Sequence, residues 1–92
     1  MSVGTLHQND KILIRRSQGR LFGRFIAGVR ENQNRSIEQV ATLAGMTMCE
    51  WLAVEAGRVP NDPNQLRQIA DALEVGHDKI AIFALICREA WD

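Results

Sequence analysis

Two short capping motifs constrain the fold of this chain more than any other feature of its sequence. Ser36 is followed three residues later by Gln39, and Thr47 is followed at the same spacing by Glu50. In such a box the hydroxyl accepts a hydrogen bond from the third backbone N–H, and the longer side chain accepts one from the cap, so each box begins a helix. Gly45 suits the left-handed residue that ends the first helix. The sequence therefore predicts two short helices joined by a tight turn.

The second helix of this pair is expected to run to Ala56 and to stop at Gly57. Two short helices joined through a glycine turn form a helix-turn-helix motif. A longer helix is expected before the pair, over residues 20–33, because its apolar residues recur at the spacing of one helical face. Those residues are Leu21, Phe22, Phe25, Ile26 and Val29. Gly23 and Gly28 are expected to weaken this helix slightly.

The segment that precedes this helix has no helical periodicity. Residues 1–10 are polar and predict a flexible terminus. Residues 11–16 are basic and partly β-branched, which is compatible with an arm or with a short strand. We therefore divide the chain into a flexible basic N-terminal arm, residues 1–19, and a folded domain, residues 20–92.

Two further helices are expected after the motif. Asp62 and Pro63 supply a cap and a first helical residue, and the helix that they begin ends before Gly76. A last helix begins near His77 and continues to about Ala90, with one apolar face in the core: Ile80, Phe83, Ala84 and Cys87. More apolar side chains cover much of the remaining circumference: Ile82, Leu85, Ile86 and Trp91. Because a small core cannot absorb them all, we expect this helix to form a homodimer interface.

The composition supports one small helical domain. A chain of 92 residues has room for a single hydrophobic core, and an apolar content of 46% with few aromatics favours an aliphatic, helical one. The longest apolar run, residues 80–87, is too short to span a bilayer, and the N-terminus shows no secretory signal. A cytoplasmic location is the default expectation. Cys49 and Cys87 lie far apart and outside any Cys-x-x-Cys spacing, so we expect no disulfide and no metal site.

Charge is balanced in total but divided along the chain. Residues 1–35 carry seven basic and two acidic side chains, whereas residues 36–92 carry four basic and nine acidic ones. A basic half of this kind suggests contact with a polyanion. The alternatives are a solvated surface, or attraction between the opposite ends of neighbouring copies.

The run Ser-Ile-Glu-Gln-Val-Ala-Thr-Leu-Ala-Gly-Met-Thr at residues 36–47, followed by Glu-Ala-Gly-Arg-Val-Pro at residues 55–60, resembles the helix-turn-helix of the lambda-repressor-like (Cro/C1, or XRE) family. The resemblance extends to residues 21–26 and 66–73, so it covers roughly residues 20–80. It implies an all-α, five-helix domain with a basic N-terminal arm. It also implies that the chain binds double-stranded DNA.

The resemblance assigns roles to particular residues. In relatives an ion pair ties the first helix to the third, and its counterparts here are Arg30 and Glu55. The third helix would enter the major groove with the following residues: Thr47, Met48, Cys49, Glu50, Leu52 and Ala53. The DNA backbone would be contacted by Lys11, Arg15, Arg16, Arg20, Arg35, Ser36 and Arg58.

The recognition positions are poor in groups that read bases. Relatives commonly carry Gln, Arg, Ser or Thr there, because such side chains distinguish base pairs by hydrogen bonding. Here Met48, Cys49 and Leu52 are apolar, and Met48 and Cys49 could contact a thymine methyl group. Glu50 is interpreted as the partner of Thr47 in the capping box. The alternative is that this apolar surface binds another protein.

No catalytic arrangement stands out. His7 and His77 are not spaced with partners as a nucleophile–base pair or a metal set, so we expect no enzymatic activity, no cofactor and no metal. The sequence favours a small transcriptional regulator of repressor type that binds operator half-sites as a homodimer. The alternative is a protein–protein interaction module, co-regulator or antitoxin-like, on the same scaffold with weak or no base readout.

Overall fold

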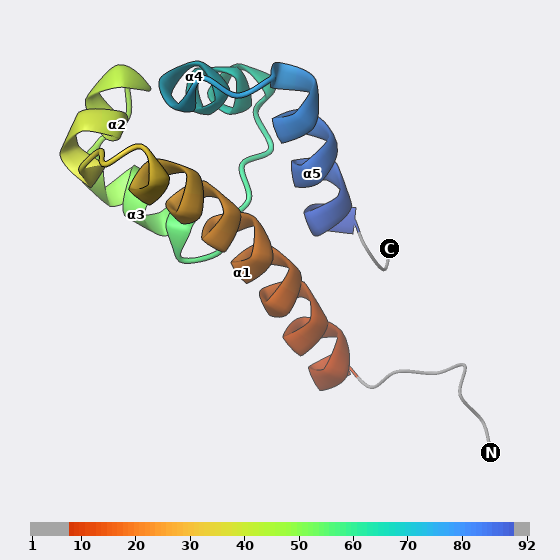
Figure 1. Cartoon of the computed structure of the whole chain (residues 1–92). Helices are drawn as coiled ribbons and strands as arrows, with labels where there is room; N and C mark the ends of the chain where they lie inside the picture. The colour runs from red at the N-terminus through yellow and green to blue at the C-terminus, as the bar shows by residue number, and fades with distance from the viewer. Residues whose placement is uncertain (1–7, 90–92) are drawn as a thin grey trace.

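The computed structural model describes the backbone of residues 8–89 and the side chains of residues 18–88. Five helices follow one another: α1 (Gln8–Asn32), α2 (Ile37–Leu43), α3 (Met48–Glu55), α4 (Pro63–Leu73) and α5 (His77–Glu89). The described backbone contains no strand. The long α1 packs against both α3 and α5, and its N-terminal part projects beyond the other helices (Figure 1). This is the all-α, five-helix domain that the sequence predicts.

Both capping boxes form as the sequence predicts. The Ser36 hydroxyl accepts from the Gln39 N–H at 3.1 Å, and Gln39 Oε1 accepts from the Ser36 N–H at 2.7 Å. Thr47 and Glu50 make the same exchange at 3.1 and 2.8 Å. Gly45 follows α2 at φ +67°, a left-handed conformation that glycine adopts without strain. These local interactions define the start of both helices and the turn between them.

The first helix begins much earlier than predicted. Residues 8–19 belong to α1, although we expected a flexible arm or a short strand over most of this segment. No proline interrupts it, and its Lys, Leu, Arg and Gln residues are good helix formers. Once the core-packed part of α1 is helical, each added residue gains a backbone hydrogen bond without a new nucleation cost. Residues 1–7 lie outside the described part of the chain.

The end of α4 is closed by Glu74 rather than by a glycine. Glu74 takes a left-handed conformation at φ 57° and ψ 39°, and Gly76 follows two residues later, past the end of the helix as the sequence predicts. Its backbone N–H still bonds to carbonyls of the last turn of α4, and its carboxylate accepts from Arg35 Nη2 at 2.9 Å. Because Arg35 lies 39 residues away in the chain, no local sequence pattern predicts its contact with Glu74.

A mainly aliphatic core around one tryptophan holds the helices together. The largest fully buried side chains are Trp51, Phe22, Ile26, Ile69, Leu73, Ile80 and Val40. Cys87 lies in this core, as expected, and burial raises the pKa of its thiol. Trp51 and Val54 are buried members of α3 and fix which side of that helix faces outward. None of the helices over the described residues is long and apolar enough to cross a membrane.

Candidate nucleic-acid interface

The outer side of α3 is an exposed, mainly apolar surface. Trp51 points into the core, which leaves Met48 and Leu52 on the solvent side with 47% and 46% of their surfaces exposed. These two residues are four apart and so share one helical face. Cys49 is exposed as well, whereas Ala53 is half-buried. The residues of α3 that the family resemblance places against base edges are therefore exposed, with the exception of Ala53.

Glu50 belongs to the capping box that begins α3. The hydrogen bonds from the backbone N–H and the hydroxyl of Thr47 hold the pKa of its carboxyl below the usual value, and the positive charge of Arg58 adds to this effect. Glu50 is therefore a capping residue, as the sequence predicts.

Two glycines let α1 approach the end of α3 closely. A Cβ on Gly19 would lie 2.2 Å from the Gly57 carbonyl oxygen, and a Cβ on Gly23 would lie 2.3 Å from the Glu55 carbonyl oxygen. Gly23 is therefore a packing residue, a role that the sequence analysis did not assign to it. The signal in the sequence was the spacing of the two glycines, which puts both on one face of α1.

The same crossing brings two cations near each other. Arg20 Cγ lies 3.5 Å from the position that a Cβ on Gly57 would take, and Gly57 is followed directly by Arg58. Both arginines are exposed. The remaining basic residues assigned to the arm, Lys11, Arg15 and Arg16, lie on the part of α1 for which only the backbone is described.

Arg30 and Glu55 lie together, mostly buried between α1 and α3. Arg30 Nε and Nη2 donate to the two carboxylate oxygens at 2.7 and 3.1 Å, and the two side chains are 13% and 11% exposed. The hydrogen bonds with Glu55 raise the pKa of Arg30. Trp51 Nε1 also donates to Glu55, at 2.6 Å, a bond that the sequence interpretation missed although the two residues are four apart. This network fixes the orientation of α3 on α1.

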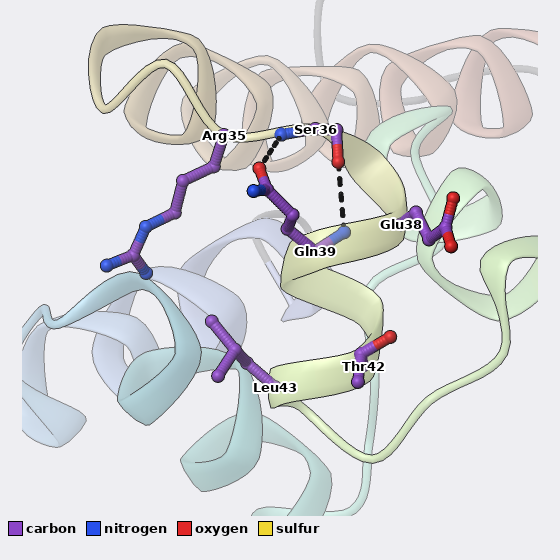
Figure 2. A pocket seen from close by; sticks show the side chains of 6 residues that line it. All are labelled: Arg35, Ser36, Glu38, Gln39, Thr42 and Leu43. Carbon is purple, nitrogen blue, oxygen red and sulfur yellow. Dashed lines mark hydrogen bonds between the residues drawn. The ribbon is translucent and has the colours of Figure 1, made fainter.

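Arg35 is held by α4. Its Nη1 donates to the Ala72 carbonyl at 2.6 Å and its Nη2 to Glu74, and neighbouring Gln33 donates to the Leu73 carbonyl at 2.7 Å. Figure 2 shows the Arg35 side chain directed toward α4. The predicted role of Arg35 as a phosphate contact does not fit this geometry, because its donors already serve the carbonyl end of a helix. Arg35 links the α1–α2 loop to α4.

Ser36 lines a shallow hollow on the surface beside α2. The hollow has a volume of about 650 Å³ and is lined by Arg35, Ser36, Glu38, Gln39, Thr42 and Leu43 (Figure 2). Ser36 is exposed, and its hydroxyl accepts from the Gln39 N–H, so its own proton can still be donated. Within the described residues, no group of three or more His, Cys, Asp or Glu side chains could hold a metal ion.

The fold and this surface together define a helix-turn-helix protein. Residues 21–82 match the sequence profile of a helix-turn-helix domain family, and the chain belongs to that family. The family is one of the XRE, or Cro/C1-like, group, which confirms the resemblance to lambda-repressor-like proteins. No curated protein and no solved structure matches the chain. The family assignment indicates a DNA-binding regulator.

Proposed function

We propose that the protein is a small repressor-type transcriptional regulator that binds two operator half-sites as a homodimer. The observation that carries the proposal is the exposed face of α3, with two exposed arginines, Arg58 and Arg20, next to the end of this helix. A convex helix flanked by cations suits a DNA groove bordered by phosphates. The protein would act in the cytoplasm on double-stranded DNA, without a cofactor and without catalysis.

In this mechanism α3 enters the major groove with its first turn against the base edges. Met48 and Cys49 would contact thymine methyl groups, since they offer no bidentate hydrogen bonds. Arg20 and Arg58 would bind phosphates, together with the Ser36 hydroxyl and the basic residues near the start of α1: Lys11, Arg15 and Arg16. Much of the affinity would then come from the DNA backbone, and specificity from methyl contacts, groove shape and half-site spacing.

The experiment is fluorescence anisotropy with a labelled duplex from upstream of the gene, beside a scrambled duplex of equal length. We expect tight binding to the native duplex alone. Between about 50 and 200 mM salt the affinity should fall by about 10³-fold, as for a protein with six or more phosphate contacts. If the native duplex fails, selection from a random duplex library identifies the preferred site before the salt series is repeated.

A second candidate function is docking to another protein, and the apolar character of α3 favours it. Met48 and Leu52 are half exposed, and methionine-rich surfaces adapt to protein partners. Equal, weak binding to both duplexes, with no sequence recovered from the library, would contradict base readout. It would support an interaction module on the same scaffold.

A further inference from the structure

A groove between α4 and α5 shares no residue with the candidate DNA interface, and we call it the α4–α5 groove. It has a volume of about 350 Å³, and its apolar lining comes from Pro63 and Leu66 of α4 and from Ala81 and Leu85 of α5. Leu66 is buried beneath it, whereas Leu85 is 45% exposed. Figure 1 shows α3 and α5 on different sides of α1, so the α5 wall of the groove lies away from α3.

Leu85 lies in this groove, although we expected it in a homodimer interface with Ile82, Ile86 and Trp91. Ile82 and Ile86 are exposed as well, but neither of them lines the groove. Trp91 lies outside the described part of the chain. The exposed apolar residues of α5 are therefore divided between two surfaces, and only Leu85 belongs to the groove.

The groove is long and narrow. Four of its lining residues share one side of α5, at spacings of three, four and three: Asp78, Ala81, Leu85 and Arg88. At a rise of about 1.5 Å per residue, this stripe is about 15 Å long. A helix with its side chains is about 10 Å across and cannot enter a groove of this volume and length. An elongated small molecule can.

Two arginines line the groove and can still donate hydrogen bonds. Arg88 is half-buried; its Nε donates to the Ala84 carbonyl at 3.4 Å, and its Nη1 donates to Asn61 Oδ1. These bonds orient the guanidinium, and within the described residues its Nη2 has no acceptor. Arg67 is exposed one turn after Pro63, and no described side chain forms an ion pair with it. A planar guanidinium matches a carboxylate, which accepts two parallel N–H bonds.

The start of α5 gives the opposite end of the groove a different charge. Asp78 lies there, ten residues before Arg88, and it disfavours a second negative group on a bound molecule. His77 is engaged with α4, because its Nε2 lies 2.6 Å from Asp71 Oδ1. A molecule that matches the whole groove is therefore negatively charged at one end only and apolar along its length. Dicarboxylates and polyphosphates do not match it.

We propose that the α4–α5 groove binds an amphipathic monocarboxylate with an unbranched apolar chain. The carboxylate accepts hydrogen bonds from Arg67 and Arg88, and the chain lies over Leu66 and Leu85 toward the start of α5. The oriented guanidinium of Arg88 lowers the cost of binding, since its side chain is already ordered. This site goes beyond the proposed function, because it does not depend on DNA.

The test is an NMR titration of the ¹⁵N-labelled whole chain with decanoate, below its micelle concentration and without DNA. We expect saturable shifts of the amide signals along the groove and a Kd of about 1 mM or lower, as for a ligand of this size. Octanoate should bind about 15-fold more weakly, because it buries two fewer methylene groups. Decanedioate, with a second carboxylate at the other end, should bind more weakly than decanoate.

Variants decide whether the groove itself holds the ligand. Arg67→Gln and Arg88→Gln should each weaken decanoate binding about tenfold, as expected for a lost charge-assisted hydrogen bond. Arg24→Gln is the matched control, an exposed arginine of α1 that does not line the groove, and should bind as the wild type does. Asp78→Asn should strengthen the binding of decanedioate more than that of decanoate, an effect that a change in stability alone would not produce.

The proposal is overturned if decanoate up to about 5 mM gives no saturable shifts, or if the shifts lie on α3 rather than along the groove. It also fails if Arg67→Gln binds decanoate as the wild type does, or if decanedioate binds as tightly as decanoate. Circular dichroism checks that each variant is folded, and Arg67→Gln decides alone if Arg88→Gln unfolds. Because no DNA is present, the result is independent of the proposed function.

Discussion

At the scale of single residues, Glu55 carries an unusual number of interactions. It accepts two hydrogen bonds from Arg30 and one from Trp51, and it ties α3 to α1. Glu55→Ala would leave a mostly buried guanidinium without a counter-charge. We expect the free energy of unfolding to fall by about 3 to 5 kcal/mol, measured by urea denaturation.

Glu55→Gln is the control for this change, because its amide oxygen can still accept from Trp51 while the charge is lost. It should be less destabilising than Glu55→Ala. A denaturation midpoint for Glu55→Ala equal to that of the wild type would show that the ion pair contributes nothing to the fold.

Glu50 makes the stability depend on pH in a defined direction. Its pKa in the folded protein lies below the ordinary value of 4.5, because the carboxylate accepts hydrogen bonds from Thr47. The stabilisation is therefore present above that value and is lost as the pH falls through the lowered pKa. The stability difference between the wild type and Glu50→Gln should narrow as the pH falls from about 6 to about 3. Thermal unfolding curves that shift in parallel for both proteins across this range would contradict the assignment.

At the scale of elements, the glycines of α1 have opposite roles. Gly23→Ala would push a Cβ against the backbone carbonyl of Glu55, which cannot move without displacing α3. We expect a loss of about 1 to 3 kcal/mol, in the range of other overpacked sites. Gly28→Ala meets no atom within 4 Å and should stabilise the monomer by about 0.5 to 1 kcal/mol through helix propensity.

Both variants are compared by chemical denaturation at low micromolar concentration, so that self-association does not contribute. The pair is a matched test, since the same substitution is made in the same helix. Equal changes in stability for Gly23→Ala and Gly28→Ala would mean that α1 and α3 are further apart than in this structure.

At the scale of the whole molecule, the proposed DNA interface predicts separate roles for two arginines near the motif. Arg58→Gln should leave stability unchanged and reduce the slope of log affinity against log salt by about one, as expected for one lost phosphate contact. Arg35→Gln should leave the slope unchanged and lower the stability by about 1.5 to 3 kcal/mol, because Arg35 bonds to the Ala72 carbonyl. Anisotropy at several salt concentrations and urea denaturation of both variants measure the two effects. If Arg35→Gln lowered the slope of log affinity against log salt and left the stability unchanged, Arg35 would be a phosphate contact after all.

The interactions that sequence alone determined are those that act within about one helical turn. Ser36 with Gln39 and Thr47 with Glu50 begin α2 and α3, and Gly45 allows the turn between them. The burial of Trp51 and Val54 shows which side of α3 is exposed, but the interface residues on that side came from the family resemblance, and their role stays a prediction. These interactions can be predicted from the sequence because both partners lie close together in the chain and their geometry follows from the helix itself.

The tertiary structure decided what depends on contacts between distant segments. Arg35 finds the carbonyl end of α4, Gly19 and Gly23 receive the end of α3, and Phe25 meets Phe83 between α1 and α5. The early start of α1 belongs here too, because the packed half of that helix extends a segment whose own pattern predicts none. These partners lie tens of residues apart, and only the packing of the core brings them within reach of each other.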